Sequence, residues 1–255
     1  MARMIAAGGY PLLLWARRAA SLESLADVGA RIAASPSALG AACDLVGLCV
    51  VSDDDVRDVA LTGGLLAAMG PGSILAIHST VRPETCQQLA AAAPAGVAVL
   101  DAPVSGSGEA ALENRLAVMA GGDAAAFETA RPVFETFGSP VRHMGALGTG
   151  QLCKLVNNIL LIANLKLATE AMAFGEGLGI EHAPLHDMLM ASSGRSFALD
   201  AVERLINPTN AAHVAGLFRK DLGLAVAAAR HAGLSVDTLR EVAERAIANI
   251  EGNAK

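Results

Sequence analysis

Short apolar runs alternate with helical patterns through the first half of this 255-residue chain and then cease. The runs at residues 10–15, 44–51, 73–77 and 97–100 have the length and composition of buried strands. Helical patterns follow at residues 21–27, 54–60 and 83–92. Alternation of this kind predicts a parallel sheet joined by right-handed crossovers, which restricts the chain to the α/β class.

The pattern changes near residue 147. Edge strands are expected at residues 116–119 and 141–143, with a helix at residues 124–137 between them. From Gln151 onward the pattern is helical, with breaks near Gly179, Gly194, Pro208 and Gly233. We therefore predict two domains, an α/β domain at residues 1–147 and an all-α domain at residues 148–255.

Composition excludes several classes of partner. The net charge of −6 leaves no basic stripe to neutralise phosphates, so no nucleic acid is expected as a partner. The apolar stretch at residues 155–174 is interrupted by polar and charged side chains, so no membrane span is predicted. The N-terminal segment lacks a signal-peptide cleavage pattern, and the cytoplasm is the expected location.

No metal site is predicted. The four cysteines have no C-x-x-C spacing, which argues against a zinc site and against a disulfide framework. His182 and His186 are four residues apart, but Pro184 lies between them, and a helix start there explains the same residues.

Lys154 and Asn158 give the best indication of function. They lie four residues apart at the start of a long apolar helix, and so on one helical face. A buried lysine without a partner is costly, and desolvation lowers its pKa toward the range of proton exchange. A catalytic role is one interpretation; the other is a lysine that extends its ammonium group to solvent from a core helix.

A second motif follows a predicted strand. Residues 101–106, Asp-Ala-Pro-Val-Ser-Gly, come directly after the apolar run 97–100, where open α/β sheets bind ligands. Together with His78-Ser79-Thr80, the glycines at 121 and 122, the Lys154 helix and Lys220-Asp221-Leu222, this loop resembles the β-hydroxyacid dehydrogenase family, which includes 3-hydroxyisobutyrate dehydrogenase and tartronate semialdehyde reductase. The resemblance covers nearly the whole chain.

The resemblance implies a reaction and its residues. It implies hydride transfer between a nicotinamide cofactor and a small 3-hydroxy acid or its semialdehyde, with Lys154 as general acid and base. Ser105, Gly106 and Asn158 would hold the substrate carboxylate, and all three offer hydrogen-bond donors suited to an anion. Ser105-Gly106 is alternatively an ordinary turn. The family also implies a homodimer or homotetramer.

The cofactor residues follow from the same resemblance. Lys220, Thr80, Val50 and Val51 correspond to positions near the cofactor, although Lys220 is alternatively part of a solvated charge pair. Arg17 and Arg18 stand where an acidic residue would bind the ribose hydroxyls of NAD. Arginine accommodates a 2′-phosphate, so NADP is expected, with NAD as a possibility; the alternative is a basic surface turn.

The chain departs from the family at its beginning. Family members start with a strand and a Gly-x-Gly-x-x-Gly turn, whereas residues 1–10 resemble the first helix and the turn into the second strand. The expected fold is therefore an N-terminally truncated Rossmann-type parallel sheet domain followed by an all-α domain. Two explanations stay open: an active NADP-dependent oxidoreductase with a wrongly placed start, or a truncated, inactive remnant that keeps only the helical oligomerisation domain.

Overall fold

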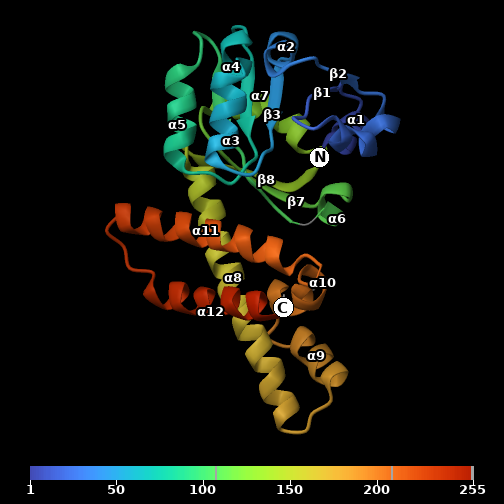
Figure 1. Ribbon diagram of the computed structural model, residues 1–255, viewed down its shortest axis with the longest axis vertical. Coiled ribbons are helices and arrows are strands. Elements are labelled where there is room, and N and C mark those ends of the chain that lie inside the picture. Colours follow the sequence, from blue (N-terminus) through green and yellow to red (C-terminus); the bar gives the residue numbers. More distant parts are fainter. Residues whose placement is uncertain (107, 208, 254–255) are drawn as a thin grey trace. The chain divides into compact units, whose positions relative to one another are not determined.

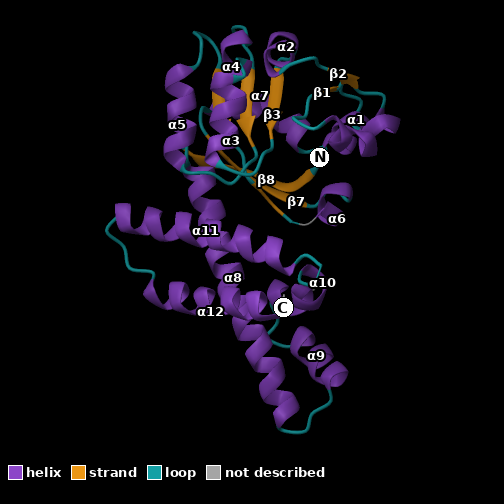
Figure 2. Cartoon of the chain, in the orientation of Figure 1, coloured by secondary structure: helices purple, strands orange, loops and turns teal. Residues whose placement is uncertain are grey.

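The computed structural model describes residues 1–106, 108–207 and 209–253; Ser107, Pro208, Ala254 and Lys255 lie outside them. The chain forms two compact units, Met1–Lys154 and Leu155–Lys255. Strands are confined to the first unit, and the described part of the second unit is built from helices and their connections (Figure 2). The predicted change from an α/β pattern to a helical pattern is therefore confirmed.

A six-stranded sheet organises the first unit. Its order is β3-β4-β5-β7-β6, and β8 pairs with β7. The strands are β3 (Leu45–Leu48), β4 (Ile74–Ile77), β5 (Ala98–Asp101), β6 (Val104–Ser105), β7 (Leu116–Gly121) and β8 (Gly138–Gly145). β3, β4 and β5 are parallel, as predicted, but β7 runs antiparallel to β5 and β6. The prediction of β7 as an edge strand was wrong, because β5, β6 and β8 all pair with it.

The segment near the N-terminus is less regular than expected. After helix α1 (Ala2–Ala7), the strands β1 (Leu13–Leu14) and β2 (Arg31–Ile32) pair in a separate two-stranded parallel sheet. The segment η1 (Ala19–Val28) between them is a 3₁₀ helix, where an α-helix was expected at residues 21–27. It ends at Gly29, whose φ of +69° lies in the left-handed region that glycine adopts without steric cost.

Helices cover both faces of the sheet. Leu75 and Ile77 of β4 pack with residues of α3 (Asp53–Arg57), η2 (Asp58–Thr62), α4 (Leu65–Ala68) and α5 (Pro83–Ala92). The alternate residues Ile74 and Ala76 point to the opposite face and pack with α7 (Ala124–Phe134), and the side chains of α1 lie against the same cluster. Helix α2 (Pro36–Ala42) packs against α4, and α6 (Gly108–Leu112) follows β6 (Figure 1). Successive side chains of β4 thus point to opposite faces of the sheet and contribute to two separate apolar cores, one on each face.

Helix α8 (Thr149–Gly177) begins in the first unit and continues into the second. In the second unit its apolar residues Leu155, Ile159 and Ile162 pack with α11 (Ala211–His231) and α12 (Asp237–Asn253). Helices α9 (His182–Ala191) and α10 (Phe197–Leu205) form a smaller cluster with α8. By length and composition α8 would suffice to cross a membrane, but core helices of soluble proteins pass the same test.

Candidate active site at the carboxyl ends of the parallel strands

The loops that follow β3 and β4 are joined by a hydrogen bond. Val50 lies just after β3, and its backbone N–H donates to the Ser79 Oγ at 2.7 Å. Ser79 lies just after β4 and is buried. Thr80, the next residue, is half-buried. The structure therefore brings together two of the predicted cofactor positions, Val50 and Thr80, at the end of the sheet where α/β proteins bind ligands.

Gln151 joins the Thr80 loop to helix α8. Its amide nitrogen donates to the Ser79 carbonyl at 2.8 Å, and its amide oxygen accepts the Val81 N–H at 3.0 Å. These two backbone groups flank Thr80 on either side. Gln151 is fully buried, so both of its hydrogen bonds are formed away from water.

Asp101 fixes the start of the same helix. Its two carboxylate oxygens accept the backbone N–H groups of Gly148 and Gln151, each at 2.6 Å. A carboxylate at this place satisfies donors that a helix N-terminus leaves without partners. Burial raises the pKa of Asp101, against the opposing effect of these N–H groups. Sequence reasoning placed Asp101 in a motif but gave it no role.

Helix α8 and the sheet approach each other closely at Gly150. A Cβ atom added there would lie 2.2 Å from the Met119 carbonyl oxygen and 2.8 Å from the Asp101 Oδ2. No L side chain tolerates such contacts, so only glycine allows the helix to start against the ends of β5 and β7. The Gly-Thr-Gly-Gln sequence at residues 148–151 is thus explained by packing as well as by hydrogen bonding.

Lys154 follows Gln151 by three residues on α8 and is 9% exposed. The alternative of a lysine that extends into solvent does not fit this burial. Ser105 is half-buried in β6, and Gly106 is exposed just beyond it. The φ of Gly106 is +139°, and a Cβ atom there would lie 2.7 Å from the Leu116 side chain, so this position also requires glycine.

Asn158 and Lys220 share a partner in the second unit. The Asn158 amide nitrogen donates to the Asp221 Oδ2 at 2.7 Å, and the Lys220 ammonium lies 3.2 Å from the Asp221 Oδ1. The Asn158 amide oxygen accepts from the Asn157 side chain at 3.0 Å. Asp221 is buried, and sequence reasoning quoted it without assigning it a role. Because an amide nitrogen carries two protons, Asn158 keeps donor capacity beyond Asp221.

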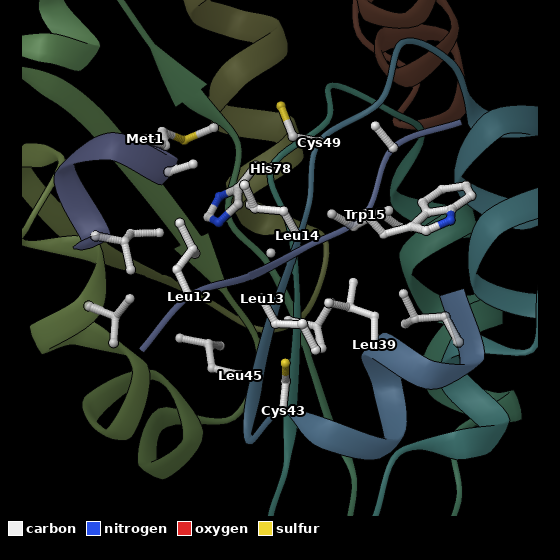
Figure 3. Close-up of a pocket in the computed structure, with 18 of the residues that line it drawn as sticks. Met1, Leu12, Leu13, Leu14, Trp15, Leu39, Cys43, Leu45, Cys49 and His78 are labelled. Carbon is white, nitrogen blue, oxygen red and sulfur yellow. The ribbon is translucent and has the colours of Figure 1, made fainter. Parts of the chain in front are cut away.

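A cavity of about 1050 Å³ lies between β1 and β3 in the first unit. Its wall is largely apolar, with Leu14 and Trp15 from the β1 segment and Leu45 from β3 (Figure 3). The predicted cofactor residues Arg17, Arg18, Val50 and Val51 all line it. Residues that are far apart in the sequence thus share one hollow of a size typical for small-molecule sites.

The arginines and the apolar wall suit the adenosine half of a dinucleotide, which presents a flat base and anionic groups. Arg17 already pairs with two carboxylates, Asp55 at 2.9 Å and Asp58 at 3.3 Å. The pKa of Asp55 is lowered, chiefly by the Ser52 hydroxyl and then by Arg17. These acidic partners, which sequence reasoning missed, compete with a phosphate for Arg17.

His78 has a structural environment. It is buried, its Nδ1 lies 2.7 Å from the Ala102 carbonyl oxygen, and its ring packs edge-on against Phe134 and Phe137. Burial lowers the pKa of His78, so the neutral ring with its proton on Nδ1 fits this contact. The prediction that His78 has no catalytic role stays a prediction.

His182 and His186 stack in parallel with ring centroids 6.4 Å apart, and the Nδ1 of His182 pairs with Glu176 at 2.6 Å. Within residues 1–106, 108–207 and 209–253, no cluster of three or more His, Cys, Asp or Glu side chains is arranged to hold a metal ion.

A doubly covered α/β sheet with its candidate site at the strand ends, followed by a helical unit, defines a class of dinucleotide-dependent oxidoreductases. Residues 1–145 match the family described as the NAD binding domain of 6-phosphogluconate dehydrogenase. Residues 148–254 match the family described as NAD-binding of NADP-dependent 3-hydroxyisobutyrate dehydrogenase. The chain belongs to the β-hydroxyacid dehydrogenase family and is an NAD(P)-dependent 3-hydroxyacid dehydrogenase family enzyme. The comparisons do not show the predicted truncation, which stays a prediction.

The names of the similar proteins refer to several hydroxy acids. The chain is 35% identical over 245 residues to the NAD-dependent L-serine dehydrogenase of Pseudomonas aeruginosa, covering 90% of this chain and 81% of that protein. It is 33% identical over 218 residues to the L-threonate dehydrogenase of Cupriavidus necator, and this match covers 82% of this chain and 72% of that protein. The structure of Mycobacterium tuberculosis 3-hydroxyisobutyrate dehydrogenase with L-serine is similar at a TM-score of 0.83 and 28% identity, covering 99% of this chain and 91% of that one.

Proposed function

We propose that this enzyme interconverts a small 3-hydroxy acid and its semialdehyde with NADP, and that Lys154 is the general acid and base. The burial of Lys154 at the start of α8, three residues after the glutamine that holds the Thr80 loop, carries this proposal. A buried ammonium group on the helix whose Gln151 contacts the loop after β4 is suited to protonate a carbonyl oxygen that gains negative charge.

The proposal gives the cofactor and each residue of the site a separate role. The nicotinamide ring supplies or accepts the hydride. Lys154 Nζ donates a proton to the carbonyl oxygen of the semialdehyde, and it removes the hydroxyl proton in the reverse direction. The Ser105 hydroxyl and the Gly106 N–H donate to the substrate carboxylate, and Asn158, one turn beyond Lys154 on α8, contributes an amide N–H. These contacts hold the substrate so that its reacting carbon is correctly oriented for hydride transfer. Correct orientation of the reacting groups accounts for a large part of the rate gain from binding.

The names of the relatives favour this substrate class. L-serine and 3-hydroxyisobutyrate each carry a primary hydroxyl group two carbons away from the carboxylate carbon, and its oxidation gives a semialdehyde. A site that recognises the carboxylate and reacts at this hydroxyl suits both. We propose the shared 3-hydroxy acid unit as the recognised chemistry.

For the cofactor, we propose NADP, with Arg17 and Arg18 facing the 2′-phosphate. Both residues line the cavity of about 1050 Å³ together with Val50 and Val51. Thr80 and Lys220 are assigned to the nicotinamide side. The carboxylates of Asp55 and Asp58 pair with Arg17 and so reduce the difference in affinity between NADP and NAD. NAD is therefore expected to bind as well, more weakly than NADP.

Replacement of the lysine tests the proposed chemistry. Lys154→Ala should lower kcat by about 10²- to 10⁴-fold, the usual contribution of a positioned acid–base group. NADPH binding, measured by fluorescence titration, should persist. Lys166→Ala is the matched control, because Lys166 is a half-buried lysine on the same helix that pairs with Glu170 at 3.1 Å. If Lys154→Ala kept a rate near that of the parent enzyme, the mechanism would be excluded.

Titration of the unmodified chain with NADPH and NADH tests the cofactor assignment separately. Tighter binding of NADPH supports the proposal. Binding of neither would overturn it and favour a catalytically inactive protein that retains only an oligomerisation role.

We also propose that the chain forms a homodimer or homotetramer through α8. Large apolar side chains at spacings of four or seven residues remain exposed along this helix, with Phe174 at 68% and Val156 at 66%. The others are Leu152, Leu160 and Leu167, and the exposed Leu178 follows the helix directly. A stripe of this kind on a single helix is typical of an interface. Light scattering after gel filtration should give a multiple of the chain mass of 25.8 kDa, and Phe174→Glu should shift it toward the monomer.

A further inference from the structure

We propose that Gln151 is a positioning residue that sets the Thr80 loop and Lys154 at a fixed separation. The proposal rests on the proposed function, in which Thr80 contacts the cofactor and Lys154 exchanges the proton. All the residues that carry it belong to the same compact unit, Met1–Lys154.

The geometry of Gln151 is specific. Its side chain forms one hydrogen bond as donor, to the Ser79 carbonyl, and one as acceptor, from the Val81 N–H. The two contacts span 72 and 70 residues of sequence. They enclose Thr80 between two fixed backbone groups. The loop therefore cannot shift relative to α8 without breaking a buried hydrogen bond.

The other end of the connection is equally fixed. The Gln151 backbone N–H donates to Asp101 at 2.6 Å, so the residue is held by β5 as well as by the loop after β4. Lys154 lies three residues further along the same helix, and residues at this spacing are neighbours on the helix surface. A displacement at Gln151 is consequently transmitted to Lys154. Hydride and proton transfer are sensitive to displacements of about 1 Å, which can cost about 100-fold in rate.

Glutamine is the side chain that this position requires. Its amide offers a donor and an acceptor on one terminal group at the reach needed to contact both Ser79 and Val81. Methionine has a similar length but offers neither a hydrogen-bond donor nor a strong acceptor. Glutamate keeps the shape, but its ionised form has no proton to donate to the Ser79 carbonyl. The protonated form of glutamate restores both bonds.

These differences separate a positioning role from a purely structural one. Gln151→Met should lower kcat at least tenfold with the substrate KM nearly unchanged, and it should increase the kinetic isotope effect measured with 4-deuterated NADPH. Gln151→Glu should recover activity relative to the parent enzyme as the pH falls, because protonation restores the bond to Ser79. Gln88→Met, at an exposed glutamine of α5, is the matched control and should behave like the parent in both assays.

A readout independent of turnover completes the test. In the cofactor-free protein, hydrogen exchange at the Val81 amide should be faster in Gln151→Met than in the parent at the same pH, whereas Gln151→Glu keeps an acceptor for this amide and should exchange at the parental rate. Faster exchange with kcat, KM and isotope effect all at parental values would assign Gln151 a structural role only and overturn the proposal. If Gln151→Met does not fold, the pH-dependent ratio of Gln151→Glu to parent decides, and a flat ratio overturns the proposal.

The outcome for Lys154→Ala distinguishes this inference from the proposed function. Full activity of Lys154→Ala would overturn both. An inactive Lys154→Ala together with parental kinetics of the Gln151 variants would overturn only the positioning role.

Discussion

The carboxylate of Asp101 accepts the backbone N–H of Gln151 at 2.6 Å and so joins the end of β5 to the start of α8 across 50 residues of sequence. The second oxygen of Asp101 accepts the Gly148 N–H at the same distance. One buried side chain thereby anchors the helix that carries Lys154 onto the sheet. The position of the proposed acid–base group is thus set by the strand end as well as by its own helix.

Replacing Asp101 should loosen this anchor. In Asp101→Asn the amide presents one acceptor and one donor group, so one of the two backbone N–H groups faces another donor. The free energy of unfolding should fall by about 1–3 kcal/mol, the cost of an unsatisfied buried group, and kcat should fall as well. Urea denaturation measures the first effect. Asp44→Asn, at an exposed position, should leave both unchanged, and an equal stability for the two variants would contradict the anchoring role.

Gly150 should not tolerate a methyl group. Gly150→Ala places a Cβ atom 2.2 Å from the Met119 carbonyl oxygen, so the helix must move away from the sheet. We expect destabilisation of at least about 1–3 kcal/mol together with loss of turnover. Gly216→Ala in α11 is the control, because the added Cβ atom would meet nothing within 4 Å apart from its own helix backbone and chain neighbours. That variant should gain about 0.5–1 kcal/mol, since alanine favours a helix over glycine. Similar thermal melting of the two variants would refute the close approach.

His78 should make stability depend on pH. Burial lowers its pKa in the folded chain, whereas an unfolded histidine has a pKa of about 6.5. As the pH falls below about 6.5, the unfolded chain binds a proton that the folded chain does not. The free energy of unfolding therefore decreases from about pH 6.5 down to the lowered pKa of His78 in the folded chain. His78→Asn does not titrate there, and its melting temperature should fall less between pH 7.5 and pH 5. His213→Asn, at an exposed position, should keep the parental slope. A parental slope in His78→Asn would argue against this assignment.

The carboxylates near Arg17 should influence the choice of cofactor. Asp58→Asn removes the partner that lies 3.3 Å from the guanidinium, which leaves Arg17 more available to a 2′-phosphate. Because the pair is exposed, we expect only about a two- to fivefold gain in the ratio of NADPH to NADH affinity. Asp54→Asn is the control, since Asp54 pairs with Arg57 and should not affect the ratio. Fluorescence titrations with both cofactors measure it, and an unchanged ratio in Asp58→Asn would remove Arg17 from the phosphate site.

The strands β3, β4 and β5 were predictable because each is a short apolar run between turn signals. The orientation of β7 was not, because its residues are compatible with either direction and only its pairing with β5 and β6 decides. The 3₁₀ geometry of η1 was missed for a similar reason, since its residues suit more than one helical form.

The residue sequence by itself determined the class of fold, the change to helices near residue 147, and the placement of Lys154 and Asn158 on one helical face, because these follow from local periodicity and spacing. The roles of Ser105, Gly106 and Asn158 at the substrate were implied by the resemblance to the family. Tertiary structure alone decided which side chains contact one another in and around the candidate site. Gln151 contacts Ser79 and Val81, Asn158 contacts Asp221, and Arg17 contacts Asp55 and Asp58. Such pairs lie tens of residues apart, and no local pattern specifies them, because a buried donor takes whichever acceptor the folded backbone brings within hydrogen-bonding distance.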